Sequence, residues 1–158
     1  SFEPDRANQM LYLADHNLPV TVWGPGWNKW LHKHPNLIIK DKILYGQDYI
    51  KAINAAKINL CFLRKINRDE VTSRSVEIPA CRGFMLAERT KRHLDLFREG
   101  REAIFFSSPE ELLSIAKKYL SADAAREKIA AAGWERCQNS GYDMKTQMAK
   151  MLETISSL

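Results

Sequence analysis

The sequence has few cysteines, no long apolar run and no recognisable leader. Its three cysteines, Cys61, Cys81 and Cys137, are scattered, which excludes a disulfide framework or a cysteine-based metal motif and predicts reduced thiols in the cytoplasm. The most apolar stretch, residues 58–63, is far shorter than the roughly 20 residues that cross a bilayer. No charged-then-apolar leader opens the chain, so nothing in it indicates secretion. The start at serine and phenylalanine indicates a trimmed sequence, which leaves a signal further upstream open.

Basic residues outnumber acidic ones, giving a net charge of +5, but they are mixed with acids, as in residues 89–99. No basic stripe interleaved with aromatic residues runs along the chain, so we expect no nucleic-acid partner. A modest positive charge equally suits a pocket for a phosphorylated small molecule.

Short apolar segments alternate with helical patterns along all 158 residues. Strands are predicted at 20–23, 37–39, 58–63, 84–87 and 103–106. Helices are predicted at 4–17, 48–57, 93–97, 110–120, 122–137 and 142–155, and a further short helix follows residue 74. Residues 107–112 are a strong helix start, with a serine N-cap and a proline in the first turn. Near-continuous apolar strands alternating with helices are typical of a parallel sheet covered on both faces. We therefore predict one α/β domain over residues 1–158, with three layers, a parallel sheet of about five strands and extra C-terminal helices.

Residues 64–74 form a polar loop between the third strand and the next helix. The loop carries three arginines and the acid pair Asp69–Glu70, more charge than a helix cap needs. In an open parallel sheet, the edge at the strand carboxyl ends is where ligands bind. Thr72 or Ser73 can instead cap the helix, so a cap surrounded by solvated charges is the alternative to a ligand site.

Gly24, Pro25 and Gly26 follow the first predicted strand directly. Two glycines allow a ligand to approach the backbone closely, although a tight turn explains them equally well. The segment is not a dinucleotide fingerprint, because the third glycine is missing and Pro25 has no N–H. His32 and His34 have no third ligand nearby, so we expect no metal site.

Several of these stretches occur together, in one order, in a known family. They are VTVWGPGW, SRSVEIPACRG, LFREGREA and SSPEEL, at residues 20–27, 73–83, 96–103 and 107–112. With them, the chain from about Pro4 to Leu152 resembles the glycosyltransferase group-1 superfamily, in particular its CgeB-like branch.

The resemblance implies a GT-B fold, in which two Rossmann-like domains face each other across a cleft. The chain resembles the C-terminal, donor-nucleotide-binding domain, and the N-terminal acceptor-binding domain is absent from this chain. The implied reaction moves a sugar from a nucleotide diphosphate sugar to a carbohydrate or related acceptor, as in polysaccharide biosynthesis. The family implies a retaining, metal-independent reaction with no cofactor beyond the donor. We expect the domain to be inactive alone, and the family is compatible with membrane association of a full protein.

The family also implies roles for individual residues. Glu77 matches the acid that binds the ribose hydroxyls. Asp69, eight positions earlier, matches the acid that contacts the sugar and is the catalytic candidate, although the broader group has glutamate there. The expected contacts to the diphosphate are Gly24, Gly26, Arg68 or Lys65, Thr72, Ser73 and Arg74.

A second interpretation makes the chain a non-catalytic, flavodoxin-like α/β domain. In that case residues 64–74 would be a surface for docking to another protein, and Glu77 would have no ligand. A phosphorylation-receiver role requires aspartates at the strand ends, and no predicted strand ends in one.

Overall fold

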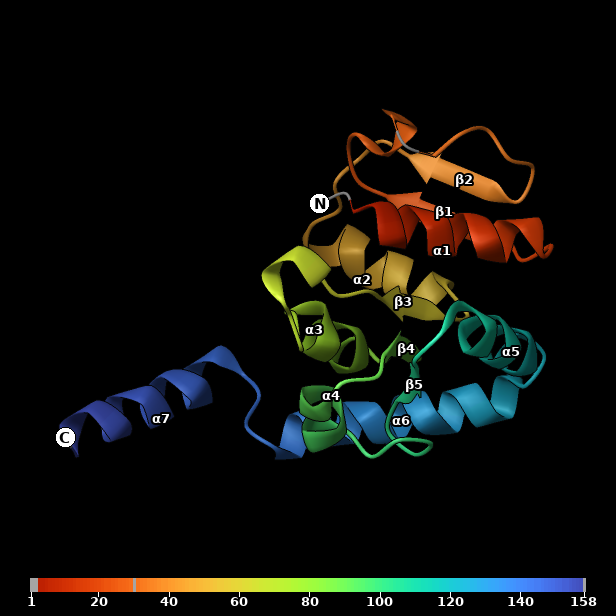
Figure 1. Ribbon diagram of the computed structural model, residues 1–158. Coiled ribbons are helices and arrows are strands. Elements are labelled where there is room, and N and C mark those ends of the chain that lie inside the picture. Colours follow the sequence, from red (N-terminus) through yellow and green to blue (C-terminus); the bar gives the residue numbers. More distant parts are fainter. Residues whose placement is uncertain (1–2, 30, 158) are drawn as a thin grey trace.

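The computed structural model describes residues 3–29 and 31–157 (Figure 1). The α-helices are α1 (Pro4–Asp15), α2 (Gly46–Ala55), α3 (Arg74–Ala80), α4 (Lys91–Leu96), α5 (Pro109–Leu120), α6 (Asp123–Asn139) and α7 (Met144–Ser156). The strands are β1 (Val20–Trp23), β2 (Leu37–Lys40), β3 (Asn59–Cys61), β4 (Met85–Glu88) and β5 (Ile104–Phe106). Two short 3-10 helices, η1 (Trp27–Lys29) and η2 (Lys65–Asn67), complete the elements. The predicted strands are thus confirmed, with ends that shift by up to two residues.

All strand pairs are parallel, as predicted, but the strands form two sheets and not one. β1 pairs with β2, and β4 lies between β3 and β5. Val20 and Val22 of β1 nevertheless belong to the same apolar cluster as Phe84 and Leu86. Side-chain packing therefore joins the two sheets where a continuous backbone ladder was expected.

β4 lies between β3 and β5 in the three-stranded sheet. Its consecutive side chains point to opposite faces of that sheet. Leu86 packs with residues of α1, α5 and α6 in one cluster, whereas Met85 and Ala87 pack with residues of α2, α3 and α6 in a second. Two apolar cores on the two faces of the strands make the three layers that the sequence predicts.

The first turn of α5 shows how local sequence sets a helix start. Ser108 accepts a hydrogen bond from the Glu111 amide through its side chain, and Pro109 occupies the first turn. Proline is favoured there because its missing N–H needs no partner. The predicted serine cap at this position is confirmed.

α7 extends away from the rest of the domain (Figure 1), and none of its side chains is buried. Five exposed apolar side chains lie three or four positions apart along it, namely Met144, Met148, Met151, Leu152 and Ile155. No helix among the described residues combines the length and the apolar character needed to cross a membrane.

Candidate functional site

The candidate site is the surface formed by residues 64–73 and the exposed side of α3. β3 ends at Cys61, and the chain passes through η2 before α3 begins. Within α3, Ser75, Ile78 and Pro79 are buried, whereas Arg74 and Glu77 are exposed. The short helix therefore presents both predicted ligand-binding side chains to solvent.

Glu77 is held by a residue that the sequence analysis missed. The Tyr49 hydroxyl of α2 donates a hydrogen bond of 3.1 Å to Glu77 Oε2. Burial, with the adjacent Glu77 charge, raises the pKa of Tyr49 above its usual value, so the phenol is a protonated donor at neutral pH. Glu77 Oε1 has no hydrogen-bond partner among the described residues. One carboxylate oxygen is thus fixed while the other is open to a ligand hydroxyl.

Arg74 is exposed and forms no ion pair with any described residue. Burial and the Glu77 charge raise the pKa of Tyr49, whereas the Arg74 charge lowers it by a smaller amount. The guanidinium is therefore close enough to the Tyr49–Glu77 pair to act on it electrostatically. An unpaired arginine beside a carboxylate can bind an anionic group while the carboxylate accepts from hydroxyls.

The predicted cap by Thr72 or Ser73 is wrong. Ser73 already has helical backbone angles, and its side chain makes no capping hydrogen bond. Instead, the Thr72 amide donates to Ser75 Oγ over 3.1 Å. The Thr72 hydroxyl lies 3.9 Å from Cys61 Sγ, so it faces the protein, whereas Ser73 is exposed.

Arg68 and Asp69 occupy a tight reversal after η2. Arg68 has a left-handed backbone, with φ of 55°, and its amide donates to the Lys65 carbonyl over 3.0 Å. The Asp69 amide donates to the Arg64 carbonyl over 3.1 Å. Neither side chain has an ion pair or hydrogen bond within residues 3–29 and 31–157. Neither side chain is therefore engaged by another described residue, and their role as ligand contacts stays a prediction.

The start of the loop is fastened to α1, across more than 50 sequence positions. The Glu3 carboxylate accepts from the amides of Lys65 and Ile66, at 3.2 and 3.4 Å. Arg6 Nε donates to the Leu63 carbonyl over 3.2 Å. Neither contact has a local sequence signal, because each joins segments 57 or more positions apart.

Lys65, the alternative to Arg68 as a diphosphate contact, is already paired. Its ammonium lies 2.9 Å from the Asp5 carboxylate, whose hydrogen bond raises the pKa of Lys65. A diphosphate at this position would compete with Asp5, so Arg68 and Arg74 are the better candidates.

Residues 24–26, the glycine loop, form a tight turn whose amides are hydrogen-bonded to neighbouring residues of the chain. Gly24 and Gly26 both have positive φ, at 132° and 81°, which favours glycine. The Gly24 amide donates to the Lys40 carbonyl over 3.0 Å, and the Gly26 amide to Asp41 Oδ1 over 3.1 Å. Both amides are occupied, so a ligand here would contact the open surface above Gly26, where an added Cβ would meet no atom within 4 Å.

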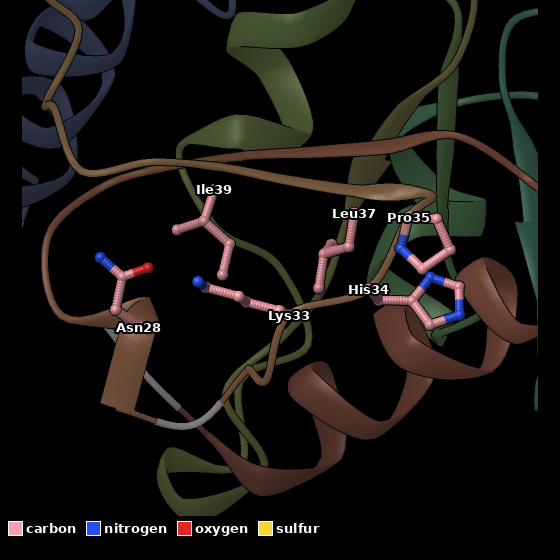
Figure 2. Close-up of a pocket in the computed structure, with 6 residues that line it drawn as sticks. All are labelled: Asn28, Lys33, His34, Pro35, Leu37 and Ile39. Carbon is pink, nitrogen blue, oxygen red and sulfur yellow. The ribbon is translucent and has the colours of Figure 1, made fainter.

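Two hollows in the surface are lined by no residue of α3. Figure 2 shows one of about 490 Å³ beside β2, lined by Asn28, Lys33, His34, Pro35, Leu37 and Ile39. His34 there pairs with Asp15 at 3.3 Å. The other, of about 460 Å³, lies between α1 and the first residues of α5. Neither is lined by Arg74 or Glu77, although the second includes Lys65 of the candidate site.

A metal site needs several ligands that converge. Across residues 3–29 and 31–157, no three His, Cys, Asp or Glu side chains gather closely enough to hold a metal ion. The candidate site offers the guanidinium groups of Arg68 and Arg74, the Asp69 carboxylate and the open oxygen of Glu77 to a ligand.

Comparison with known proteins decides the family. The model of the glycosyl transferase-like family matches residues 6–153. The chain belongs to this family. No curated protein matches the sequence.

The fold of this glycosyl transferase-like domain also matches solved structures. Crystal structures of Anabaena Alr3699/HepE, one in complex with UDP and glucose and one with UDP-glucose, superpose with TM-scores of 0.77 and 0.78. Sequence identity is 15% in both cases, and 96% and 99% of this chain are covered. The chain spans less than half of the solved chains, 44% and 47% of their length. The Rossmann-like α/β fold is thereby confirmed.

Proposed function

We propose that this chain is the donor-binding domain of a glycosyltransferase that transfers a sugar from a nucleotide diphosphate sugar to a carbohydrate or related acceptor. Family membership and the UDP and UDP-glucose in the structures of similar fold support the donor class. The observation that carries the proposal is the arrangement on α3, where Tyr49 fixes one oxygen of Glu77 and leaves the other open beside the unpaired Arg74.

Each group has a role that follows from its chemistry. The open oxygen of Glu77 accepts from a ribose hydroxyl, since charge-assisted hydrogen bonds to a carboxylate are strong and directional. Arg74, with Arg68 and the Ser73 hydroxyl group, lies toward the diphosphate and offsets the negative charge that grows as the sugar leaves. The Thr72 hydroxyl, which faces Cys61, is not part of this set. Asp69 contacts the sugar. Gly24 and Gly26 provide a surface that the donor can approach closely.

Finer features belong to the same proposal. They are membership of the CgeB-like branch, retention of stereochemistry, independence of metal ions, a role in polysaccharide biosynthesis and a cytoplasmic site of action. In the proposed enzyme a second, acceptor-binding domain completes the cleft, so the domain alone binds donor nucleotide weakly and does not catalyse transfer.

Calorimetry with UDP and GDP tests the site. We expect the wild-type chain to bind one of them and Glu77→Ala to weaken that binding by about tenfold, the effect of losing a charge-assisted hydrogen bond. Glu127→Ala is the matched control, since Glu127 is an exposed glutamate near the start of α6 and is not part of the candidate site. Equal affinity of the wild type and Glu77→Ala, or no binding of either nucleotide, would overturn the site.

The partner-docking interpretation predicts the opposite pattern. If residues 64–74 serve only to contact another protein, Glu77→Ala leaves all binding unchanged, while charge reversal of Arg68 abolishes capture of that protein. No contact in the structure favours this interpretation over donor binding.

A further inference from the structure

A buried hydrogen bond joins α3 to α4 directly beneath the candidate site. Ser75 Oγ lies 2.7 Å from His93 Nε2, and both residues are fully buried, with no exposed surface. Ser75 lies between Arg74 and Glu77 in α3, but its side chain faces the protein and theirs face solvent. A contact at Ser75 therefore acts on the same helical turn that presents the donor-binding groups.

The acceptor on the other side of the imidazole determines its tautomer. His93 Nδ1 lies 2.6 Å from the Glu88 carbonyl oxygen. A carbonyl only accepts, so Nδ1 carries the proton and Nε2 accepts from the Ser75 hydroxyl. Burial lowers the pKa of His93, which keeps this neutral form. His93 also stacks on Phe105, with ring centroids 5.5 Å apart and planes within 7°.

Ser75 transmits the contact to the loop. Its Oγ accepts from the Thr72 amide over 3.1 Å while its proton points to His93. A chain of hydrogen bonds thus runs from Thr72 through Ser75 and His93 to the end of β4. Cys61 Sγ also lies 3.7 Å from Ser75 Oγ, but it is a weaker acceptor at a longer distance, so His93 Nε2 is the main acceptor of the Ser75 proton.

The first turn of α4 holds the same loop at a second point. Thr90 Oγ1 donates to the Glu70 carbonyl over 2.7 Å and accepts from the His93 amide over 3.1 Å. Thr90 therefore caps α4 and at the same time fixes the loop immediately after Asp69. Two residues of α4 thus hold residues 70–75 at both ends.

We propose that His93 is a positioning residue of the donor site: by accepting the Ser75 hydroxyl proton, it fixes the loop and the first turn of α3 that carry Asp69, Arg74 and Glu77. This role rests on the proposed function. The imidazole itself is buried and does not touch the donor. Without His93, the Ser75 hydroxyl has only the weaker acceptor Cys61 Sγ, 3.7 Å away, and the Thr72 amide loses a firmly oriented partner.

Two substitutions test the two ring nitrogens of His93 separately. In His93→Gln the side-chain oxygen takes the place of Nε2 and accepts from Ser75. In His93→Asn the amide takes the place of Nδ1 and donates to the Glu88 carbonyl, which leaves Ser75 only the weaker side-chain acceptor Cys61 Sγ, 3.7 Å away. We would measure UDP affinity by calorimetry and amide hydrogen exchange across residues 69–77, well below each melting temperature.

The expected result is a difference between the two variants. His93→Asn weakens UDP binding by about tenfold and speeds exchange of the Thr72 amide, whereas His93→Gln stays within about threefold of the wild type in affinity. Ser75→Ala removes the donor of the same hydrogen bond and replaces His93→Asn in the test if that variant fails to fold. Its UDP affinity and its amide exchange should equal those of His93→Asn.

Two outcomes would overturn the inference. One is equal loss in the Gln and Asn variants, which would show that packing of the ring matters and its acceptor nitrogen does not. The other is wild-type affinity and exchange in both His93→Asn and Ser75→Ala. If the wild type binds neither UDP nor GDP, the proposed function fails separately, and the exchange rates of residues 69–77 still decide whether His93 positions the loop.

Discussion

The Tyr49 hydroxyl and the Glu77 carboxylate, 28 positions apart in the chain, meet at 3.1 Å and connect α2 to α3. Tyr49→Phe removes only the donor. We expect it to weaken UDP binding about two- to fivefold, because Glu77 then loses its fixed orientation, and to change the free energy of unfolding by less than about 1 kcal/mol. Calorimetry and urea unfolding measure the two effects. Tyr45→Phe is the control, since the Tyr45 side chain is 75% exposed. Tighter UDP binding by Tyr49→Phe would mean that Tyr49 competes with the ligand.

The fold around α3 depends on a close approach of α6. A Cβ added at Gly133 would lie 2.5 Å from the Glu102 carbonyl oxygen and 3.4 Å from Pro79 Cβ of α3. Gly133→Ala gains about 1 kcal/mol in helix propensity. Overpacking against backbone costs about 1–3 kcal/mol, so we expect a net loss of stability in thermal unfolding.

Ala131→Gly serves as the comparison within the same helix, at an exposed position. It should lower stability by about 1 kcal/mol through helix propensity alone. A Gly133→Ala variant that is more stable than the wild type would show that α6 can move away from residue 102.

His93 makes stability depend on pH. Burial lowers its pKa in the folded chain below the ordinary value of 6.5. Above pH 6.5 neither the folded nor the unfolded chain protonates this residue. Below it the unfolded chain binds the proton and the folded chain does not, so the free energy of unfolding falls as the pH falls.

Urea unfolding at pH 7.5 and 5.5 tests this effect. The loss of stability on acidification should be larger for the wild type than for His93→Gln, by at most about 1.4 kcal/mol per pH unit. Other groups titrate equally in both proteins, so the difference isolates His93. Identical pH dependence of the two proteins would contradict a neutral, buried imidazole.

Arg89 joins three segments at the carboxyl ends of β4 and β5. Its guanidinium pairs with Glu99 at 2.5 Å and with Glu111 at 3.0 Å, and donates to Ser107 at 2.6 Å. The hydrogen bonds to both carboxylates raise its pKa, so it stays charged.

Arg89→Lys keeps the positive charge, but a lysine ammonium cannot make the hydrogen bonds of the guanidinium to both Glu99 and Glu111. Because all three side chains are partly exposed, we expect a loss of only about 1 kcal/mol, smaller in 1 M NaCl. Thermal unfolding at low and high salt measures this loss. Arg92→Lys is the control, at an exposed arginine with no ion pair among the described residues. Equal effects of the two substitutions would show that the cluster adds no stability.

Elements with a local signal could be predicted from sequence. The apolar strands lie within two residues of their predicted places, and α5 begins at its serine and proline as expected. The exposed place of Glu77 and Arg74 also follows from the pattern of α3, where the apolar residues take the other side.

The features that sequence did not predict all depend on long-range packing. Tyr49 was placed on one side of a predicted helix, but nothing local pairs it with Glu77. The serine that accepts the Thr72 amide is Ser75 and not Ser73, because His93, brought in by α4, draws the Ser75 hydroxyl inward. The division into two sheets likewise depends on how close β1 comes to β3, which local propensity does not determine.

α7 has a consequence for how the chain unfolds. A helix of 13 residues with no buried side chain gains almost nothing from the domain, and isolated helices of that length are only marginally stable in water. Its helix–coil equilibrium should therefore be independent of the melting of the domain. Far-ultraviolet circular dichroism should lose a small part of its helical signal gradually on warming, before the cooperative transition. Burial of the apolar side of α7 would stabilise the helix. Any surface that covers Met148 and Ile155 would therefore make α7 unfold in the same cooperative transition as the domain.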